Sequence, residues 1–176
     1  MSYQAVILTV SDSCAAGTRT DTSGPAIRAM LENAGFAVQA MQTVPDEEGQ
    51  ISAAIVHACD ILQADLVVTT GGTGLSPRDV TPEATLAVLD REIRAIPVAM
   101  WVEGLKSTPR AMLSRAVAGT RGHTLVLNVP GSEKAARENL GAVVATLDHA
   151  LRMLAAVGTD KQKTRAAAAA RVFYFF

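Results

Sequence analysis

Short apolar segments alternate along the chain with longer segments whose apolar residues recur every three or four positions. Four short segments predict strands, and the first and third are so apolar that both of their faces must be covered. The predicted strands are residues 5–10, 36–44, 64–70 and 124–129. Strands that alternate with helices favour an α/β fold with three layers (αβα), in which helices cover both faces of an open, mostly parallel sheet.

The segments between these strands predict helices. Ser23 and Gly35 stand where a helix start and a helix end prefer such residues. The predicted helices are residues 23–34, 47–62, one from Thr81, 94–118 and a long one after Gly131. Within 94–118, Pro97 and Pro109 are expected to break the helix.

A chain of 176 residues suits one domain, which we place at residues 1–160, followed by a tail at 161–176. The tail starts with basic residues and ends in four aromatic side chains, Phe173 to Phe176. Because each would expose a large apolar surface, we expect this end to dock on a groove of its own subunit or of a neighbour. The alternative is an extension without a role, in which case deleting 161–176 would change neither stability nor oligomeric mass.

Composition excludes several classes of protein. With 49% apolar and 19% charged residues, the chain is not disordered. Four of its 16 basic residues lie in the tail, which has no acid, so the domain is acidic and nucleic acid is not expected as a partner. No apolar run approaches a membrane span, and no basic segment marks a signal peptide. Cys14 and Cys59 form no metal or redox motif, which favours two buried thiols in a reducing cytoplasm.

Three loops that follow predicted strands carry candidate chemistry. They are Ser11-Asp12-Ser13, Gly71-Gly72-Thr73-Gly74 and Pro130-Gly131-Ser132. In a parallel α/β sheet, ligands bind at the carboxyl ends of the strands, and glycine turns let backbone N–H groups approach an anion. These loops therefore predict a ligand that carries phosphate, although simple tight turns are an alternative. The spacing matches neither the Walker A nor the dinucleotide-binding motif.

Two carboxylates also lie in segments that follow predicted strands. Asp46 comes directly after the second predicted strand, and Asp79 lies five residues beyond Gly74. Together they can hold a Mg²⁺ ion that bridges phosphate oxygens. Asp46 can instead cap a helix, and Asp79 can instead pair with Arg78 or cap the helix at Thr81.

Taken together, the motifs are those of one family, in the same order along the chain. They are Thr9-Val-Ser-Asp-Ser13, Asp21-Thr-Ser-Gly-Pro25, Val44-Pro-Asp46, Thr69-Thr-Gly-Gly-Thr-Gly74, Pro77-Arg-Asp-Val-Thr-Pro-Glu-Ala84, Ala111-Met-Leu-Ser-Arg115 and Pro130-Gly131. Over residues 5 to about 155, the chain resembles the molybdopterin-binding MogA-type proteins, which include the G domains of gephyrin and of its plant counterpart.

The resemblance implies an enzyme of molybdenum cofactor synthesis. Such enzymes transfer AMP from ATP to the terminal phosphate of molybdopterin, with Mg²⁺, and release pyrophosphate. By position, Asp46 and Asp79 match the catalytic and metal-binding aspartates. The residues that match substrate-binding positions are Ser11, Asp12, Asp21, Gly71, Gly72, Thr73, Gly74, Ser114, Pro130, Gly131 and Ser132. The resemblance also implies a homotrimer, with a molybdate-inserting enzyme as the downstream partner, and the two thiols place the protein in the cytoplasm.

The chain departs from the gephyrin-like members at one loop. Those members have Pro-Gly-Asn-Pro where this chain has Pro130-Gly-Ser-Glu133. The serine form is similar to that of the MoaB branch. An alternative function is therefore to bind molybdopterin without adenylylating it. A scaffolding role, as in gephyrin, is a further alternative that would call for additional domains.

Overall fold

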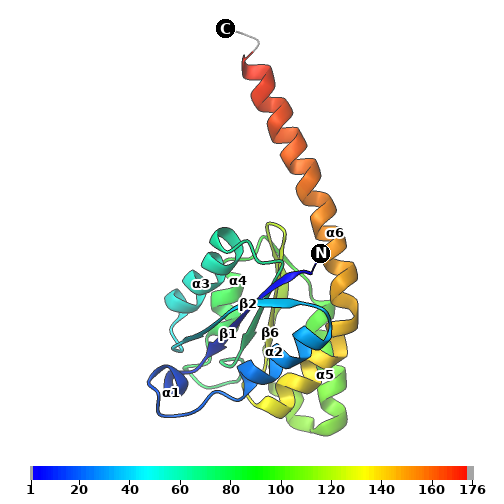
Figure 1. Cartoon of the computed structure of the whole chain (residues 1–176). Coiled ribbons are helices and arrows are strands. Elements are labelled where there is room, and N and C mark those ends of the chain that lie inside the picture. The colour runs from blue at the N-terminus through cyan, green and yellow to red at the C-terminus, as the bar shows by residue number, and fades with distance from the viewer. Residues whose placement is uncertain (1, 174–176) are drawn as a thin grey trace.

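The computed structural model describes the backbone of residues 2–173 and the side chains of residues 2–155. Six strands form one sheet in the order β2-β1-β3-β6-β5-β4 (Figure 1). The parallel strands are β1 (Gln4–Val10), β2 (Ala37–Val44), β3 (Leu66–Thr70) and β6 (Thr124–Val129). These four confirm the predicted strands.

Two short antiparallel strands complete the sheet at one edge. β5 (Ala118–Arg121) pairs with β6, and β4 (Arg91–Glu92) pairs with β5. The prediction of a helix up to residue 118 was wrong at its end, because α5 covers Ala95–Ser107 and a 3₁₀ helix, η2, covers Pro109–Leu113. Pro97 does not break α5, since it lies in the first turn, where its missing N–H costs no helical hydrogen bond. Pro109 does mark a break, at the start of η2.

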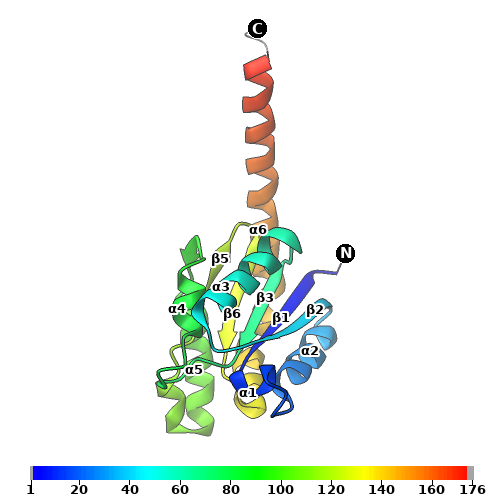
Figure 2. The same cartoon turned by 90° about the vertical axis from the view of Figure 1, so that its left-hand side faces the viewer.

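Helices cover both faces of the sheet, as predicted (Figure 2). Besides α5 and η2, the helices are α1 (Asp12–Ala15), α2 (Ser23–Asn33), α3 (Glu48–Val56), which continues as the π-helix η1 (His57–Ile61), α4 (Thr81–Leu86) and α6 (Glu133–Phe173). Along β1, Ile7 faces the core with α2, α5 and α6, and the next residue, Leu8, faces the core with α3 and α4. Alternate residues of a strand point to opposite faces, so a run of apolar residues serves both cores.

Strand register brings the carboxyl ends of three parallel strands to one edge of the sheet. Thr9 of β1 is level with Thr70 of β3, and Thr70 is level with Val129 of β6. The loops that follow these strands therefore leave the sheet side by side. This edge is where a ligand site is expected in an open parallel sheet.

Two sequence predictions concern cysteines and the tail. Both cysteines are free; Cys59 is buried as predicted, but Cys14 is only half-buried. Within the described part of the chain, no helix has both the length and the apolar character to cross a membrane. The backbone of α6 continues to Phe173 (Figure 1), whereas the predicted docking of the aromatic end concerns side chains that lie outside the described residues.

Candidate functional site

The glycine loop after β3 touches both neighbouring loops. A Cβ atom on Gly71 would lie 2.2 Å from the carbonyl oxygen of Val10, and a Cβ atom on Gly131 would lie 3.0 Å from the Cα atom of Gly71. Gly71 also has a φ of +102°, which favours glycine. The Thr70 hydroxyl donates to the carbonyl of Pro130 over 2.8 Å. The three candidate loops therefore meet at one point.

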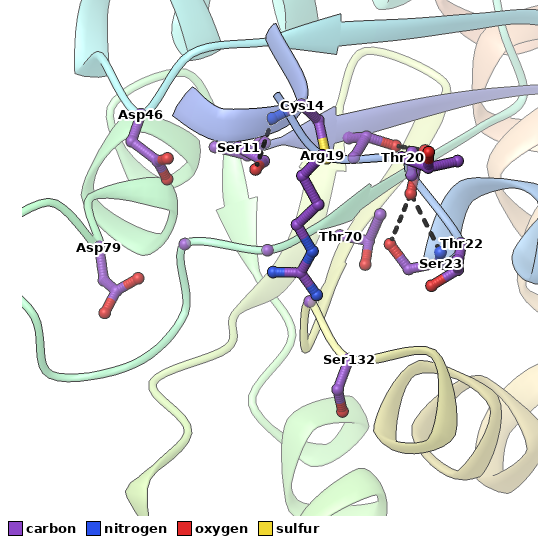
Figure 3. A pocket seen from close by; sticks show the side chains of 16 residues that line it. Ser11, Cys14, Arg19, Thr20, Thr22, Ser23, Asp46, Thr70, Asp79 and Ser132 are labelled. Carbon is purple, nitrogen blue, oxygen red and sulfur yellow. Dashed lines mark hydrogen bonds between the residues drawn. The ribbon is translucent and has the colours of Figure 1, made fainter. Parts of the chain in front are cut away.

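Beside this junction lies a polar cavity of about 330 Å³ (Figure 3). We call it the polar pocket. Its walls come from the ends of β1 and β3, the segment between α1 and α2, and the two glycine loops. The predicted site residues among its lining are Ser11, Asp21, Asp46, Gly71, Gly72, Asp79, Gly131 and Ser132.

A second cavity, of about 300 Å³, lies beside Thr73 and Gly74 of the glycine loop, whereas Gly71 and Gly72 line the polar pocket. Its walls come from that loop, α5, η2 and the start of α6, and include the apolar side chains of Ala111, Leu113 and Ala135. We call it the apolar pocket. The predicted site residues that line it are Thr73, Gly74, Ser114, Pro130 and Ser132. Ser132 lines both cavities, so the two lie next to each other.

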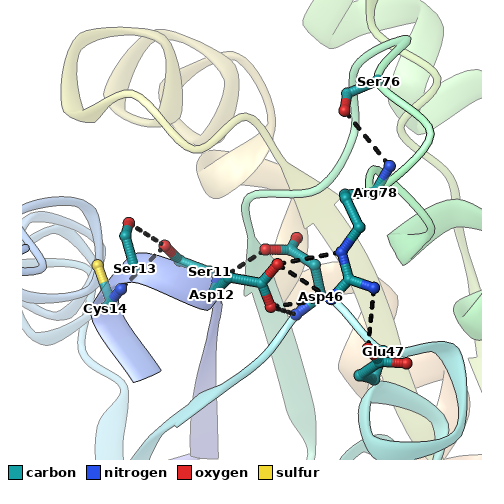
Figure 4. A network of polar contacts seen from close by, with 8 residues as sticks. All are labelled: Ser11, Asp12, Ser13, Cys14, Asp46, Glu47, Ser76 and Arg78. Carbon is teal, nitrogen blue, oxygen red and sulfur yellow. Dashed lines mark hydrogen bonds and ion pairs between the residues drawn. The ribbon is translucent and has the colours of Figure 1, made fainter. Parts of the chain in front are cut away.

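Asp12 lines neither cavity, but it holds Asp46 in place (Figure 4). The N–H of Asp12 donates to Oδ2 of Asp46 over 2.8 Å, and the N–H of Asp46 donates to Oδ1 of Asp12 over 2.9 Å. Arg78 crosses this pair: its Nε donates to Oδ2 of Asp12 over 3.1 Å, and its Nη1 donates to Glu47 over 2.8 Å. The network fixes the loop that carries the Asp46 carboxylate.

The two paired aspartates differ in charge environment. Burial raises the pKa of Asp46, and the charges of Asp12 and Asp79 raise it further. For Asp12, the hydrogen bond from the Asp46 backbone lowers the pKa most, burial opposes it, and the hydrogen bond and charge of Arg78 lower the pKa further. The ionised form of Asp46 is thus disfavoured by its surroundings, and a cation bound beside it would relieve that penalty.

The structure rules out the alternative helix-capping and pairing roles of the aspartates. Glu47, not Asp46, stands at the cap position of α3, and Val80 stands at that of α4. Arg78 pairs with Asp12 and Glu47 rather than with Asp79. Oδ2 of Asp79 instead accepts from the Ser76 N–H over 2.8 Å.

The free oxygens of the two aspartates suit a hard cation. Oδ1 of Asp46 and Oδ1 of Asp79 accept no hydrogen bond from any described residue. Both carboxylates lie against the glycine loop, because a Cβ atom on Gly72 would come within 3.1 Å of Asp46 Oδ1, and one on Gly74 within 2.9 Å of Asp79 Oδ2. Across residues 2–155, no group of three His, Cys, Asp or Glu side chains could hold a metal by itself. A pair of carboxylates fits Mg²⁺, which takes its remaining ligands from substrate phosphates and water.

Asp21 uses its carboxylate to organise the start of α2. Oδ1 accepts from the N–H and the hydroxyl of Ser23 and from the N–H of Gly24, each over 3.0 Å, and Oδ2 accepts from the Thr9 hydroxyl over 2.6 Å. Burial alone would raise the pKa of Asp21, but these hydrogen bonds outweigh it, and the pKa is lowered. Asp21 lines the polar pocket, yet both of its oxygens already have partners in the protein.

Two arginines at or beside the site were not predicted from the sequence. Arg19 is the only cationic side chain in the described lining of the polar pocket, over which it extends (Figure 3). It lies in a polar loop with no motif that would signal it. Arg115 lies within one of the family motifs, but its contacts with Gly74 and Asp79 join residues more than thirty positions apart, and no local pattern encodes them.

The fold and the site define an α/β domain whose glycine loops and paired carboxylates suit a phosphate-bearing ligand. A family described as "Probable molybdopterin binding domain" matches residues 6–149. The chain belongs to this family, as the motifs indicated.

Relatives of known name agree with this assignment. The chain is 37% identical over 152 residues to a molybdopterin adenylyltransferase of Helicobacter pylori, a match that covers 84% of this chain and 85% of that protein. It is 41% identical over 158 residues to gephyrin of Dictyostelium discoideum, covering 84% of this chain and 22% of that protein. The crystal structure of the molybdopterin biosynthesis enzyme MoaB from Thermus thermophilus matches with a TM-score of 0.83 and 49% identity, covering 86% of this chain and 96% of that one. The chain spans less than half the length of the larger curated relatives that it matches.

Proposed function

We propose that the protein is a molybdopterin adenylyltransferase, which transfers AMP from ATP to the terminal phosphate of molybdopterin. The observation that carries this proposal is the pair of adjoining pockets that share Ser132. The apolar pocket, with Ser114 in its wall, suits a flat pterin ring. The polar pocket, with Asp46 and Asp79, suits a nucleotide triphosphate.

The reaction joins two phosphates at the glycine loop between the pockets. A terminal phosphate oxygen of molybdopterin attacks the α-phosphorus of ATP and forms the new P–O bond. The bond from the α-phosphorus to the oxygen that bridges it to the β-phosphorus breaks, and its electron pair leaves with pyrophosphate. No proton transfer is needed at the attacking oxygen when that phosphate is ionised.

This chain's own groups position the phosphates. The backbone N–H groups of Gly72, Thr73 and Gly74 make no hydrogen bond within the described residues, so they can donate to phosphate oxygens. Ser132 Oγ accepts a hydrogen bond from the N–H of Ala135 over 3.3 Å at the start of α6. The positive end of that helix dipole favours an anion there. Arg19 adds a positive charge above the polar pocket.

Asp46 and Asp79 are the proposed Mg²⁺ ligands. When bound, the ion would offset the negative charge of the triphosphate and of the two carboxylates. Asp12 and Asp21 act indirectly in this proposal: Asp12 holds Asp46, and Asp21 holds the start of α2 beside the polar pocket.

A MoaB-like role, in which molybdopterin is bound but not adenylylated, is the second candidate. It is favoured by Ser132 in the loop before α6 and by the 49% identity to the Thermus thermophilus MoaB. Both candidates place molybdopterin in the same apolar pocket. They differ in whether ATP is used.

We further propose a homotrimer. Val98, Val102 and Leu105 lie on one face of α5, three or four residues apart, with exposed fractions of 48%, 57% and 44%. Met112 and Leu113 of η2 extend the set of exposed apolar side chains. A face of this kind suits burial against another copy, and the family resemblance supplies the number three. A light-scattering mass near 18.4 kDa, that of one chain, would contradict the proposal.

Two further parts of the proposal concern the surroundings. The free thiols of Cys14 and Cys59 suit a reducing compartment, so we place the protein in the cytoplasm. The adenylylated product calls for a second enzyme that inserts molybdate, and we propose such an enzyme as the downstream partner.

The decisive experiment incubates the purified protein with molybdopterin, ATP and Mg²⁺ and measures pyrophosphate. The control is Asp79→Asn, which is nearly isosteric but removes the charge that would hold the metal. We expect pyrophosphate release by the wild type and a loss of several orders of magnitude in the variant, with molybdopterin binding retained. Equal turnover in the variant would exclude the role of Asp79. Binding of molybdopterin without any pyrophosphate from the wild type would favour the MoaB-like candidate.

A further inference from the structure

Arg115, in the segment between η2 and β5, forms hydrogen bonds with the loop that carries Asp79. Its Nε donates to the carbonyl of Gly74 over 2.7 Å, and its guanidinium also donates to the carbonyl of Asp79 and pairs with the carboxylate of Glu83. Its backbone N–H donates to the carbonyl of Thr73 over 2.9 Å. One side chain therefore binds both ends of the segment 74–79 and the helix that follows it.

Besides Arg115, the segment 74–79 is attached to the rest of the domain by the side chain of its own Arg78, which binds Asp12 and Glu47. It contains no helix or strand, and Leu75 at its tip is 65% exposed. Within it, the N–H of Asp79 donates to the carbonyl of Ser76 over 2.9 Å, and the N–H of Ser76 donates to Oδ2 of Asp79 over 2.8 Å. These bonds shape the turn but do not attach it to the body of the domain. Its two ends, at the carbonyls of Gly74 and Asp79, are attached by Arg115, whose planar group of five donors suits several acceptors at once.

We infer that Arg115 is a positioning residue for AMP transfer, one that holds the Asp79 carboxylate where it can share a cation with Asp46. The inference rests on the proposed function and extends it to a residue that touches neither pocket. It adds to the contacts of Arg78, which lies next to Asp79 and joins this segment to Asp12 and Glu47. Arg78 thus links the two loops that carry the aspartates, and Arg115 fixes the two ends of the loop that carries Asp79.

The inference predicts an effect on the metal side of the site and not on the pterin side. Ser114, the residue before Arg115, lines the apolar pocket. The backbone bond from Arg115 to Thr73 does not involve the guanidinium, so replacing the side chain leaves Thr73 and Ser114 attached, and Gly74 loses one bond at its carbonyl. We call the side-chain contacts of Arg115 with Gly74, Asp79 and Glu83 the clamp. Losing the clamp should therefore lower kcat and metal affinity while the affinity for molybdopterin stays the same.

Two substitutions grade the loss of the clamp. Arg115→Met keeps the length and apolar stem but removes every donor, and Arg115→Lys keeps the charge but not the planar set of donors. Arg28→Met, which removes an arginine paired with Glu32 on α2, is the matched control. The measurements are kcat, KM for molybdopterin, Mn²⁺ binding by electron paramagnetic resonance with a non-hydrolysable ATP analogue, and melting temperature.

We expect kcat to fall about 100-fold in Arg115→Met and about tenfold in Arg115→Lys, because a misplacement of roughly 1 Å costs on that order. Mn²⁺ binding should weaken in the same order, with KM for molybdopterin within about twofold of the wild type. The control variant should match the wild type in all of these measurements.

Two results would overturn the inference. One is Mn²⁺ affinity unchanged in both Arg115 variants. The other is a loss of molybdopterin affinity in parallel with kcat, which would indicate a general collapse of the site. If Arg115→Met fails to fold, Arg115→Lys decides on the same readouts. If the wild type releases no pyrophosphate, the proposed function fails on its own, and Mn²⁺ binding still tests the clamp.

Discussion

Replacing Asp21 with alanine tests whether this carboxylate is a structural cap or a substrate ligand. The substitution removes the acceptor for the N–H of Gly24 and for the N–H and hydroxyl of Ser23, and it removes the partner of the Thr9 hydroxyl. Ser23 and Thr9 are 3% and 5% exposed, so water cannot readily replace the lost bonds. We therefore expect Asp21→Ala to destabilise the fold before it affects binding.

The expected magnitude follows from these contacts. Losing a helix-start acceptor costs about 1 kcal/mol, and each buried hydroxyl left without its partner adds roughly 1 kcal/mol. The free energy of unfolding should thus fall by about 3 kcal/mol. For a domain of this size, that corresponds to a drop in melting temperature of roughly 6–12 °C.

Asp21→Asn is the control, because its carbonyl oxygen can still accept at α2 and the Thr9 hydroxyl can accept from its amide. It should cost less than the alanine variant, and its cost should depend on pH. The pKa of Asp21 is lowered in the folded protein. The stability that its charge contributes is present above the ordinary pKa of about 3.9 and is lost as the pH falls through the lowered value. The urea stability of the wild type and of Asp21→Asn should therefore differ at neutral pH and converge in acid.

A different pattern would refute this reasoning. If Asp21→Ala melts like the wild type but loses affinity for molybdopterin or for an ATP analogue, Asp21 is a ligand and not a cap. Both affinities should be measured well below the melting temperature of the variant, so that unfolding does not imitate a binding defect.

Three further changes probe the carboxylates, the glycine loop and the oligomer. Asp46→Asn should abolish AMP transfer yet melt at or above the wild-type temperature at neutral pH, because burial raises the pKa of Asp46 and disfavours its charge. In acid, where the wild-type carboxyl group is also protonated, this stability advantage of the variant should vanish. A lower melting temperature of the variant at neutral pH would contradict the reasoning. Gly72→Ala should destabilise by roughly 1–3 kcal/mol in urea unfolding, since Gly72 has a φ of +62° and the new Cβ would lie 2.3 Å from the Thr81 hydroxyl, whereas the control Gly49→Ala, with no atom within 4 Å, should stabilise α3 by about 0.5–1 kcal/mol. Val102→Glu should convert the proposed trimer to monomers in light scattering without lowering the melting temperature of the domain, and an unchanged mass would place the interface elsewhere.

Much of the candidate site could be predicted from the sequence because it follows strand ends. Each buried strand is marked by its own apolar run, and the residues after it come to the same edge in any parallel sheet. Ser11, Asp46 and Gly71 were placed by this reasoning, and all three line the polar pocket. The family resemblance added Ser114, which no strand end marks.

Other features depended on partners far away in the chain. β5 has the sequence Ala118-Gly-Thr-Arg121, with no apolar run, and it is a strand because β6 offers it an edge and the surrounding elements bury it. Whether Asp46 caps a helix or faces a ligand could not be decided locally either. Its partner proved to be the backbone of Asp12, 34 residues earlier.

The sequence by itself determined the alternation of strands and helices, the glycine turns and the choice of carboxylates, because these depend on local period and residue type. Only the tertiary structure decided that the candidate site comprises two cavities that share Ser132, and that Arg78 and Arg115 hold the loops that carry the aspartates. A long arginine side chain can reach many acceptors. Which of them it binds is decided by how the loops pack, and no local pattern records that packing.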